Sequence, residues 1–288
     1  MRAGIHFWNY NTPDGERSIA RAVADTAATA EAGGFSQFTV MDHWFQMEMT
    51  GDPAQPMLEA FTTLGFVAAQ TTSMRLGPLV TGVTYRYPGL LAKTVTTLDV
   101  LSEGRAMLGL GAAWYEREHH ALGVPYPAIS ERFERLEEAL QVAEQMWSED
   151  TGPYHGRHYR LEETLNSPRP VSTPHPPIMI GGRGEKKTLR IAAQYAQIVN
   201  LTAFDPDDVA HLLDVLRRHC DAAGTDYDAI EKQAMATRLN PTAPEFWPTM
   251  ERLAGLGIDL VVFGVRPDDQ VTTTARLAEG VLPRLAEL

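Results

Sequence analysis

The chain has 288 residues, of which 44% are hydrophobic and 22% are charged. This composition is typical of a globular protein with a sizeable core, and no segment approaches the ~18 consecutive apolar residues of a membrane span. The net charge of −12 argues against a nucleic acid or an anionic membrane as partner, because such surfaces bind clustered Lys and Arg. With Cys220 as its single cysteine, the chain can form no internal disulfide, so we expect a cytosolic protein with a small-molecule ligand.

Eight short apolar segments that alternate with helical patterns are predicted to be β-strands. They cover residues 3–7, 37–41, 75–81, 106–110, 178–180, 197–201, 233–237 and 260–265. Strands that alternate with helices usually pair in parallel, and eight repeats in about 250 residues fit an α/β fold of the (β/α)8 TIM-barrel type. We therefore expect one domain over residues 1–288, with a doubly wound open sheet as the alternative architecture.

Capping residues and apolar stripes predict several helices between and after these strands. Ser130-Glu131 precede one stripe, Asp205-Pro206 begin another that Gly224 ends, and residues 271–285 carry the last. The stretch 148–177 is rich in Gly, Pro and His and breaks this rhythm. We interpret it as an insertion before the fifth strand, placed where it could cover the barrel mouth.

In a TIM barrel the reacting groups lie where strands end, so the residues after each strand are the first candidates. After the second strand come Asp42, His43 and Trp44. Histidine titrates near physiological pH, and Asp42 could orient or charge it. The other interpretation is that Asp42 caps the following loop while His43 is simply packed.

The third and fourth strands end in segments that could receive a flat ligand. Leu79-Val80-Thr81 continue past the expected strand end with a glycine behind them, as in a bulge or a close approach of backbone to ligand. After the fourth strand, Gly111-Ala112-Ala113 precede Trp114 and Tyr115. A planar ring could lie against these small residues, although a tight strand-to-helix turn explains them equally well.

The fifth strand runs into Gly181-Gly182-Arg183-Gly184, and a helix containing Leu189 follows. Glycines directly before a helix N-terminus present free N–H groups and a positive dipole end, which together bind anions. This order of strand, glycine turn and helix predicts a phosphate site. It is the strongest signal for a ligand in the sequence.

Two other patterns could suggest metals, and neither is convincing. Glu116 and His119 have the spacing of a di-iron ligand pair, but the required second copy is missing. His155 and His158 lack a supporting acid or thiol. We expect no metal site, and a metal-dependent barrel hydrolase is the last hypothesis in order of preference.

These four strand ends together resemble the bacterial luciferase-like superfamily, and within it the branch that depends on the deazaflavin coenzyme F420. The resemblance runs from Ile5 to about Gly264, and its most specific part is the glycine turn with the Glu-Lys-Lys-Thr-Leu that follows it. It implies that Gly181 and Gly182 donate backbone N–H groups to the coenzyme phosphate, within the turn that Arg183 and Gly184 complete.

The resemblance also implies how the coenzyme ring is held. Leu79-Val80 falls at the family's cis peptide, with Thr81 next to it, and Gly111, Ala112 and Ala113 border the ring. Asp42 would contact the coenzyme, and His43 would stand beside the face where hydride passes.

At Trp114 the sequence departs from the sugar-phosphate dehydrogenases of this branch, which carry a proton-donating glutamate there. We expect an apolar or planar organic substrate instead, in a pocket that includes Trp44, Trp114 and Tyr115, with His43 as acid or base. The leading hypothesis is hydride transfer with F420. A reduced-FMN monooxygenase and a catalytically silent flavin-binding barrel are the competing hypotheses, and the resemblance implies a homodimer.

Overall fold

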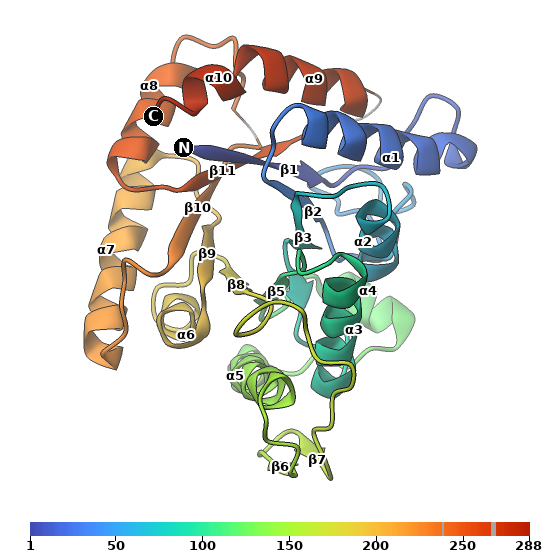
Figure 1. Cartoon of the computed structure of the whole chain (residues 1–288), viewed down its shortest axis with the longest axis vertical. Coiled ribbons are helices and arrows are strands. Elements are labelled where there is room, and N and C mark those ends of the chain that lie inside the picture. Colours follow the sequence, from blue (N-terminus) through green and yellow to red (C-terminus); the bar gives the residue numbers. More distant parts are fainter. Residues whose placement is uncertain (238, 266–268) are drawn as a thin grey trace.

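Parallel strands surround a central axis, and helices cover them on the outside (Figure 1). This computed structural model describes residues 1–237, 239–265 and 269–288. The strands are β1 (Arg2–Phe7), β2 (Gln37–Val40), β3 (Arg75–Pro78), β4 (Thr81–Gly82), β5 (Leu108–Gly111), β8 (Ile178–Gly181), β9 (Ile198–Leu201), β10 (Glu231–Met235) and β11 (Leu260–Gly264). All eight predicted strands are confirmed, and the third is divided into β3 and β4.

The sheet closes on itself, so the prediction of a doubly wound open sheet as second architecture is wrong. Its strand order is β3-β2-β1-β11-β10-β9-β8-β5-β4. The two ends of this order meet because β3 and β4 are consecutive parts of one strand, and because Leu76 of β3 forms a parallel bridge with Ala106, ahead of β5. The N–H of Leu76 donates to Arg105 at 2.8 Å, and the N–H of Met107 donates to Leu76 at 2.9 Å.

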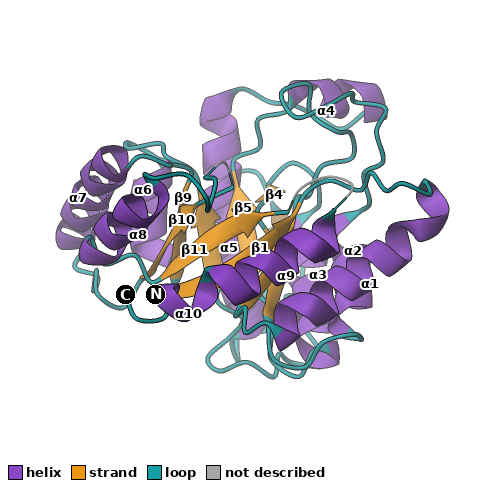
Figure 2. Ribbon diagram, turned by 90° about the horizontal axis from the view of Figure 1, so that it is seen from above, coloured by secondary structure: helices purple, strands orange, loops and turns teal. Residues whose placement is uncertain are grey.

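Helices lie around the strands in Figure 2, while α4 stands away from that ring on long loops. The helices are α1 (Glu16–Ala32), α2 (Ala60–Ala68), α3 (Pro88–Leu101), α4 (Glu116–Leu122), α5 (Ile129–Trp147), α6 (Thr188–Tyr195), α7 (Pro206–Ala223), α8 (Phe246–Gly255), α9 (Gln270–Gly280) and α10 (Leu282–Leu285). The apolar faces of the helices other than α4 pack on the outside of the strands in one large buried cluster.

Of the predicted helix boundaries, those of α7 are confirmed and the start of α5 is displaced. The side chain of Asp205 caps α7 by accepting from the N–H groups of Asp207 and Asp208, and Gly224 ends the helix in a left-handed conformation, as predicted. By contrast, α5 begins at Ile129, so the predicted capping pair at 130–131 lies within the first turn. The last stripe forms two helices, which meet at Val281.

The insertion at 148–177 does not cover the barrel mouth, so that prediction is wrong. It contains a short hairpin of β6 (Tyr154–His155) and β7 (Arg160–Leu161). Glu138 on α5 accepts backbone N–H groups of residues 157–159, and Asp99 on α3 accepts those of Val171 and Ser172. These contacts hold the insertion along the outer helices and lead it to the opposite end of the barrel.

Candidate active site

A cavity of about 390 Å³ opens at the carboxyl ends of the barrel strands. With β3 and β4 counted as one strand, the ends of seven strands contribute to its wall. The lining residues are His6, Met41, His43, Met47, Leu79, Val80, Thr81, Gly82, Tyr85, Gly111, Ala112, Ala113, Trp114, Gly181, Gly182, Asn200, Thr202 and Met235. All four segments singled out in the sequence therefore reach this one cavity. It lies where TIM barrels carry their active sites.

The Leu79–Val80 peptide bond is cis, as the resemblance implied, and it separates β3 from β4. The Val80 side chain occupies the space that neighbouring glycines leave free. A Cβ on Gly111 would lie 3.0 Å from Val80 Cγ2, and one on Gly181 would lie 2.9 Å from Val80 Cγ1. The glycines of two adjacent strands thus make room for this bulge, which explains part of the glycine-rich pattern by packing alone.

Beside the bulge, Gly111, Ala112 and Ala113 form a low wall of small side chains. Ala113 has a φ of 59°, which is uncommon for a residue with a Cβ. Its carbonyl accepts a hydrogen bond of 3.2 Å from Arg132 on α5, whose guanidinium also lies over the Tyr126 ring. Together with the bulge, this wall offers a flat apolar surface.

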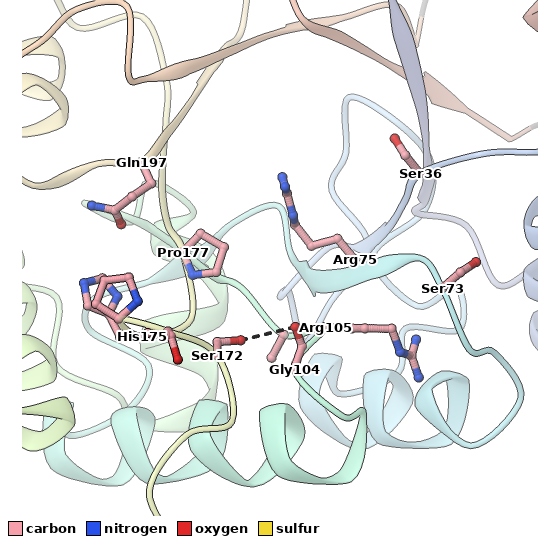
Figure 3. Close-up of a pocket in the computed structure, with 12 residues that line it drawn as sticks. Ser36, Ser73, Arg75, Gly104, Arg105, Ser172, His175, Pro177 and Gln197 are labelled. Carbon is pink, nitrogen blue, oxygen red and sulfur yellow. Dashed lines mark hydrogen bonds between the residues drawn. The ribbon is translucent and has the colours of Figure 1, made fainter.

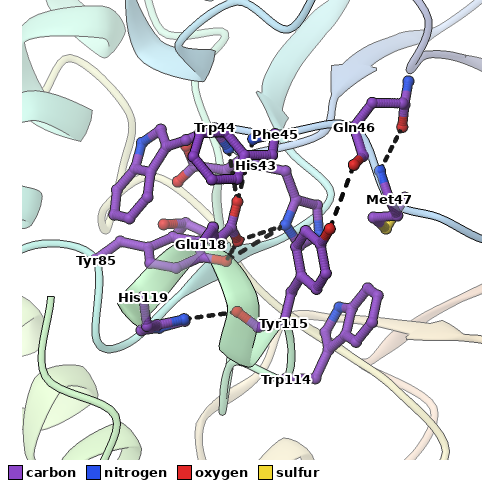
Figure 4. Close-up of polar contacts among 12 residues, drawn as sticks. His43, Trp44, Phe45, Gln46, Met47, Tyr85, Trp114, Tyr115, Glu118 and His119 are labelled. Carbon is purple, nitrogen blue, oxygen red and sulfur yellow. Dashed lines mark hydrogen bonds and ion pairs between the residues drawn. The ribbon is translucent and has the colours of Figure 1, made fainter. Parts of the chain in front are cut away.

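His43 faces the cavity, and its partner is Glu118 on α4 (Figure 4). His43 Nδ1 lies 2.7 Å from Glu118 Oε1. The carboxylate is fully buried, and its second oxygen accepts the backbone N–H of Trp44 at 2.8 Å. The Tyr85 hydroxyl also donates to Oε1. The prediction that Asp42 orients His43 is therefore wrong, since Glu118 has this place.

Electrostatics keeps Glu118 ionised. Burial of its carboxylate opposes ionisation, but the hydrogen bonds and charge of His43 and the hydroxyl of Tyr85 outweigh it and lower the pKa of Glu118. Burial, followed by the Glu118 charge, raises the pKa of Tyr85, so this phenol stays protonated and donates. An ionised carboxylate only accepts, so His43 Nδ1 carries the hydrogen of the pair and Nε2 is the atom left to exchange a proton.

A second histidine, His6 at the end of β1, also lines the cavity. Its Nδ1 lies 3.0 Å from Thr39 Oγ1, and the Thr39 hydroxyl donates to the Ile5 carbonyl. His6 Nδ1 therefore donates to Thr39. Burial, and then the neighbouring His43, lower the pKa of His6 to about 3, so its imidazole is neutral near pH 7.

Asp42 does not line the cavity, because its buried carboxylate is turned to Arg86. The guanidinium holds both carboxylate oxygens, with Arg86 Nη1 at 2.5 Å and Nη2 at 3.1 Å. It also donates to Thr81 and Glu59. This arrangement ties the end of β2 to β4 and α2, and it leaves no carboxylate oxygen of Asp42 directed at a ligand in the cavity.

The three aromatic residues predicted for the substrate pocket behave differently. Trp114 lines the cavity and meets His43 edge-on, with ring centres 5.4 Å apart. Trp44 packs on Tyr85 outside the lining. Tyr115 is buried with Met41 and Met47, and its hydroxyl donates to Glu48 at 2.8 Å. Trp44 and Tyr115 thus support the wall from behind.

In the glycine turn, the Gly182 N–H, one of the two phosphate donors that the resemblance implied, is not free. The Gly182 N–H donates to the Asn200 carbonyl at 3.1 Å, because the β8–β9 ladder continues to this residue. Within the described ranges, the backbone N–H groups of residues 183–188 have no acceptor. Arg183 is half-exposed and pairs with Asp208 at 3.1 Å. Neither Arg183 nor Gly184 lines the cavity, so an anion site would lie beside it, at the start of α6.

The opposite end of the barrel holds a second pocket, of about 540 Å³ (Figure 3). Its polar side chains are already used by the protein. Arg75 pairs with Glu231, Arg105 donates to four carbonyl groups and a hydroxyl, and Ser172 donates to Asp99. These groups stabilise the amino ends of the barrel strands and are not available to a ligand. In the cavity at the mouth, by contrast, His43 Nε2 has no partner among the described residues.

Glu118, Tyr85 and His6 are site residues that the sequence analysis missed. Glu118 lies four residues after Trp114, in the very segment that was considered for metal binding. Among the described residues, no group of three or more His, Cys, Asp or Glu side chains could hold a metal ion. In the same part of the chain, no helix is long and apolar enough to cross a membrane.

The comparisons with known proteins agree with this fold. A family model described as luciferase-like monooxygenase matches residues 1–243, so the chain belongs to that family. An F420-dependent glucose-6-phosphate dehydrogenase of Kineococcus radiotolerans is 36% identical over 166 residues, which cover 57% of this chain and 48% of the relative. The chain thus matches about half the length of that enzyme.

Other relatives differ in their names. An uncharacterized protein of Mycobacterium tuberculosis is 30% identical over 284 residues, covering 94% of this chain and 95% of the relative. An FMNH2-dependent dimethylsulfone monooxygenase of Pseudomonas putida is 34% identical over 95 residues, 33% of this chain and 26% of that protein. The solved structure of an F420-dependent secondary alcohol dehydrogenase, with an F420-acetone adduct, superimposes with a TM-score of 0.81 at 19% identity and covers 99% of each chain. The homodimer stays a prediction.

Proposed function

We propose that this protein is an F420-dependent oxidoreductase that moves a hydride between the deazaflavin and a small organic substrate, with His43 as the proton-exchanging residue. The observation that carries the proposal is the pair of His43 and ionised Glu118 at 2.7 Å, at the edge of a flat-walled cavity. A carboxylate on one imidazole nitrogen fixes the orientation and the tautomer of the ring. The other nitrogen is then an acid–base group at the reaction site.

The residues present fit such a coenzyme. The bulge at Val80 and the small side chains of residues 111–113 suit a planar ring, and the unpaired N–H groups of residues 183–188 suit a phosphate at the start of α6. When bound, the deazaflavin would supply or accept the hydride. The relatives named as F420-dependent enzymes support this choice of coenzyme.

The chain's own part in the reaction is to move a proton and exclude water. In the oxidising direction the substrate C–H bond would break as hydride leaves to the oxidised coenzyme. The O–H proton would pass to His43 Nε2, and a C=O bond would form. Glu118 holds the imidazole in place and balances its positive charge, while Trp114 covers His43 from the side. Reduction would reverse these steps.

Titration of the purified protein with F420 and with FMN tests the coenzyme. We expect tight F420 binding and a shift in the deazaflavin absorption. Tight binding of FMN with no affinity for F420 would contradict the proposal. A His43→Ala variant should bind F420 and lose hydride transfer. Full activity in this variant would show that His43 has no catalytic role.

The second candidate is a monooxygenase that uses reduced FMN, because FMN also joins a flat ring to a phosphate. The similarity to the dimethylsulfone monooxygenase of Pseudomonas putida supports it. Oxygen consumption with reduced FMN, measured with and without the protein, distinguishes it from F420 chemistry.

A further inference from the structure

A layer of buried amide side chains crosses the interior of the barrel at the base of the cavity. Gln37 on β2 and Gln233 on β10 form a reciprocal pair, in which each Nε2 donates to the other Oε1, at 3.2 and 2.9 Å. Asn200 on β9 is the register partner of Gln233, and its Nδ2 donates to Gln233 Oε1 at 3.3 Å. TIM-barrel interiors are usually filled by branched apolar side chains, and buried amides are unfavourable unless their hydrogen bonds are made. A polar layer at this place therefore indicates a role beyond packing.

Glu231 fixes the direction of the amides in this layer. Its carboxylate accepts from Gln233 Nε2 at 2.6 Å and pairs with Arg75. Burial opposes ionisation of Glu231, but the charge of Arg75 and the hydrogen bond from Gln233 lower its pKa, so it stays a carboxylate that only accepts. Gln233 therefore points Nε2 at Glu231 and Oε1 at Asn200, and Asn200 points Nδ2 at Gln233. Oδ1 is then the amide atom of Asn200 left to face the cavity.

Asn200 lies at the edge of the flat surface, on the side of the glycine turn. In the order β5-β8-β9, the residues at this level of the barrel are Gly111, Gly181 and Asn200. The two glycines leave their space to Val80, so Asn200 is the one of the three whose side chain can reach a ligand. The N–H groups proposed to hold a phosphate follow the glycine turn, at residues 183–188. A ligand with a flat ring on the bulge and a phosphate at the start of α6 therefore passes Asn200 with the chain that joins the two.

We infer that Asn200 Oδ1 accepts a hydrogen bond from a hydroxyl of the polyol chain that joins the coenzyme ring to its phosphate, and that Gln233 positions Asn200 for this contact. The inference rests on the proposed function for the presence of a coenzyme with a ring and a phosphate. It does not depend on which coenzyme is bound, because F420 and FMN both carry such a chain. An oriented amide oxygen selects a hydroxyl because a hydroxyl can donate a hydrogen to it.

Ligands that share a ring and differ in their side chain test the contact. Fluorescence titration would measure the binding of F420, of the same deazaflavin ring with the polyol chain but no phosphate, and of this ring with only a methyl group, to the protein and to an Asn200→Leu variant. FMN, riboflavin and lumiflavin form the parallel flavin set. We expect Asn200→Leu to weaken binding of the first two ligands of a set about 2- to 12-fold, the range of one neutral hydrogen bond, and to change binding of the methyl compound by less than about twofold.

The pattern across a set decides between the possible outcomes. Equal losses for all three ligands, or no loss for any of them, would overturn the inference. Binding of the flavin set without the deazaflavin set would contradict the proposed coenzyme, and the flavin series would then decide on Asn200. Failure of both sets to bind would contradict the proposed function and the inference together.

Further variants separate the contact from general damage to the core. Gln233→Leu removes the acceptor that orients Asn200, and we expect it to reduce the preference for the polyol ligand over the methyl compound, which a loss of stability alone does not change. Asn166→Leu is the matched control, because Asn166 is also a buried asparagine (5% exposed, against 1% for Asn200) and its Nδ2 donates to the Thr96 side chain on α3, outside the barrel. It should lower the denaturant midpoint and leave all three affinities unchanged; the same change of preference in this control would contradict the inference. If Asn200→Leu does not fold, Asn200→Ala takes its place with the same expected pattern.

Discussion

Replacing Glu118 by Gln removes one charge from the candidate site and preserves the shape of the side chain. In the protein, one carboxylate oxygen accepts from His43 and Tyr85 and the other from the backbone N–H of Trp44. The amide has one oxygen and one NH2 group, so one of these two sets of donors would face another donor. The variant therefore either misplaces His43 or weakens the loop that carries it.

The magnitude follows from the kind of hydrogen bond that is lost. Bonds to a charged group contribute about 1.5–3 kcal/mol and neutral ones about 0.5–1.5, so the His43 contact weakens by about 1–1.5 kcal/mol. Each 1.4 kcal/mol corresponds to a factor of ten, so we expect kcat for hydride transfer to fall about 5- to 12-fold. F420 affinity should stay within about twofold, since Glu118 does not line the cavity.

Steady-state kinetics over a range of pH, together with F420 titration, measures this effect. A positioning role predicts that the pH profile of kcat changes with the variant, because the ionised carboxylate of Glu118 is replaced by a neutral amide, whereas a purely structural role lowers kcat without changing the profile. Glu116→Gln is the matched control, since Glu116 lies on the same helix, is exposed and pairs with His120. A folded Glu118→Gln protein with unchanged kcat and pH profile would refute the reasoning.

The remaining predictions concern stability. Gly181→Ala should destabilise the fold by about 1–3 kcal/mol, because the new Cβ would lie 2.9 Å from Val80 Cγ1; an unchanged urea midpoint would contradict this. Asp42→Ala should destabilise by about 1.5–3 kcal/mol, because the partly buried Arg86 loses its bidentate partner and keeps only Glu59; an unchanged denaturant midpoint in this variant would contradict this. As pH falls from about 6.5 towards 3, the unfolded His6 binds a proton that the folded, buried imidazole does not take up, so its stabilising effect is present above 6.5 and is lost on acidification. The loss should approach about 1.4 kcal/mol per pH unit, and His6→Gln should reduce this slope; equal slopes in both proteins would show that another group causes it.

Features set by neighbours in the chain were predictable from the sequence. The eight strands follow from short apolar runs between helical stripes, and the cap at Asp205 follows from a side chain two residues from its partner. The glycine turn was found in the same way. One of its two implied donors, the Gly182 N–H, is not free, because β9 runs far enough alongside it to accept its hydrogen bond.

Features set by contacts across the fold were not predictable in this way. Glu118 lies 75 residues from His43 in the chain, and their contact depends on where α4 stands over the strand ends. The sequence places an acid next to His43, namely Asp42, and local proximity suggested that these two would pair. The arginine that takes Asp42 instead lies 44 residues away, so neighbouring residues gave no sign of it.

The two histidines of the cavity wall are held in opposite ways, and this difference assigns the proton. His6 donates from Nδ1 to Thr39, a neutral partner, and burial keeps it uncharged. His43 donates from Nδ1 to Glu118, an ionised partner that fixes the ring and leaves Nε2 facing the cavity. His43 also lowers the pKa of His6, so a proton on one ring disfavours a proton on the other. We therefore propose that a proton released in the cavity goes to Nε2 of His43, while His6 remains a neutral part of the wall.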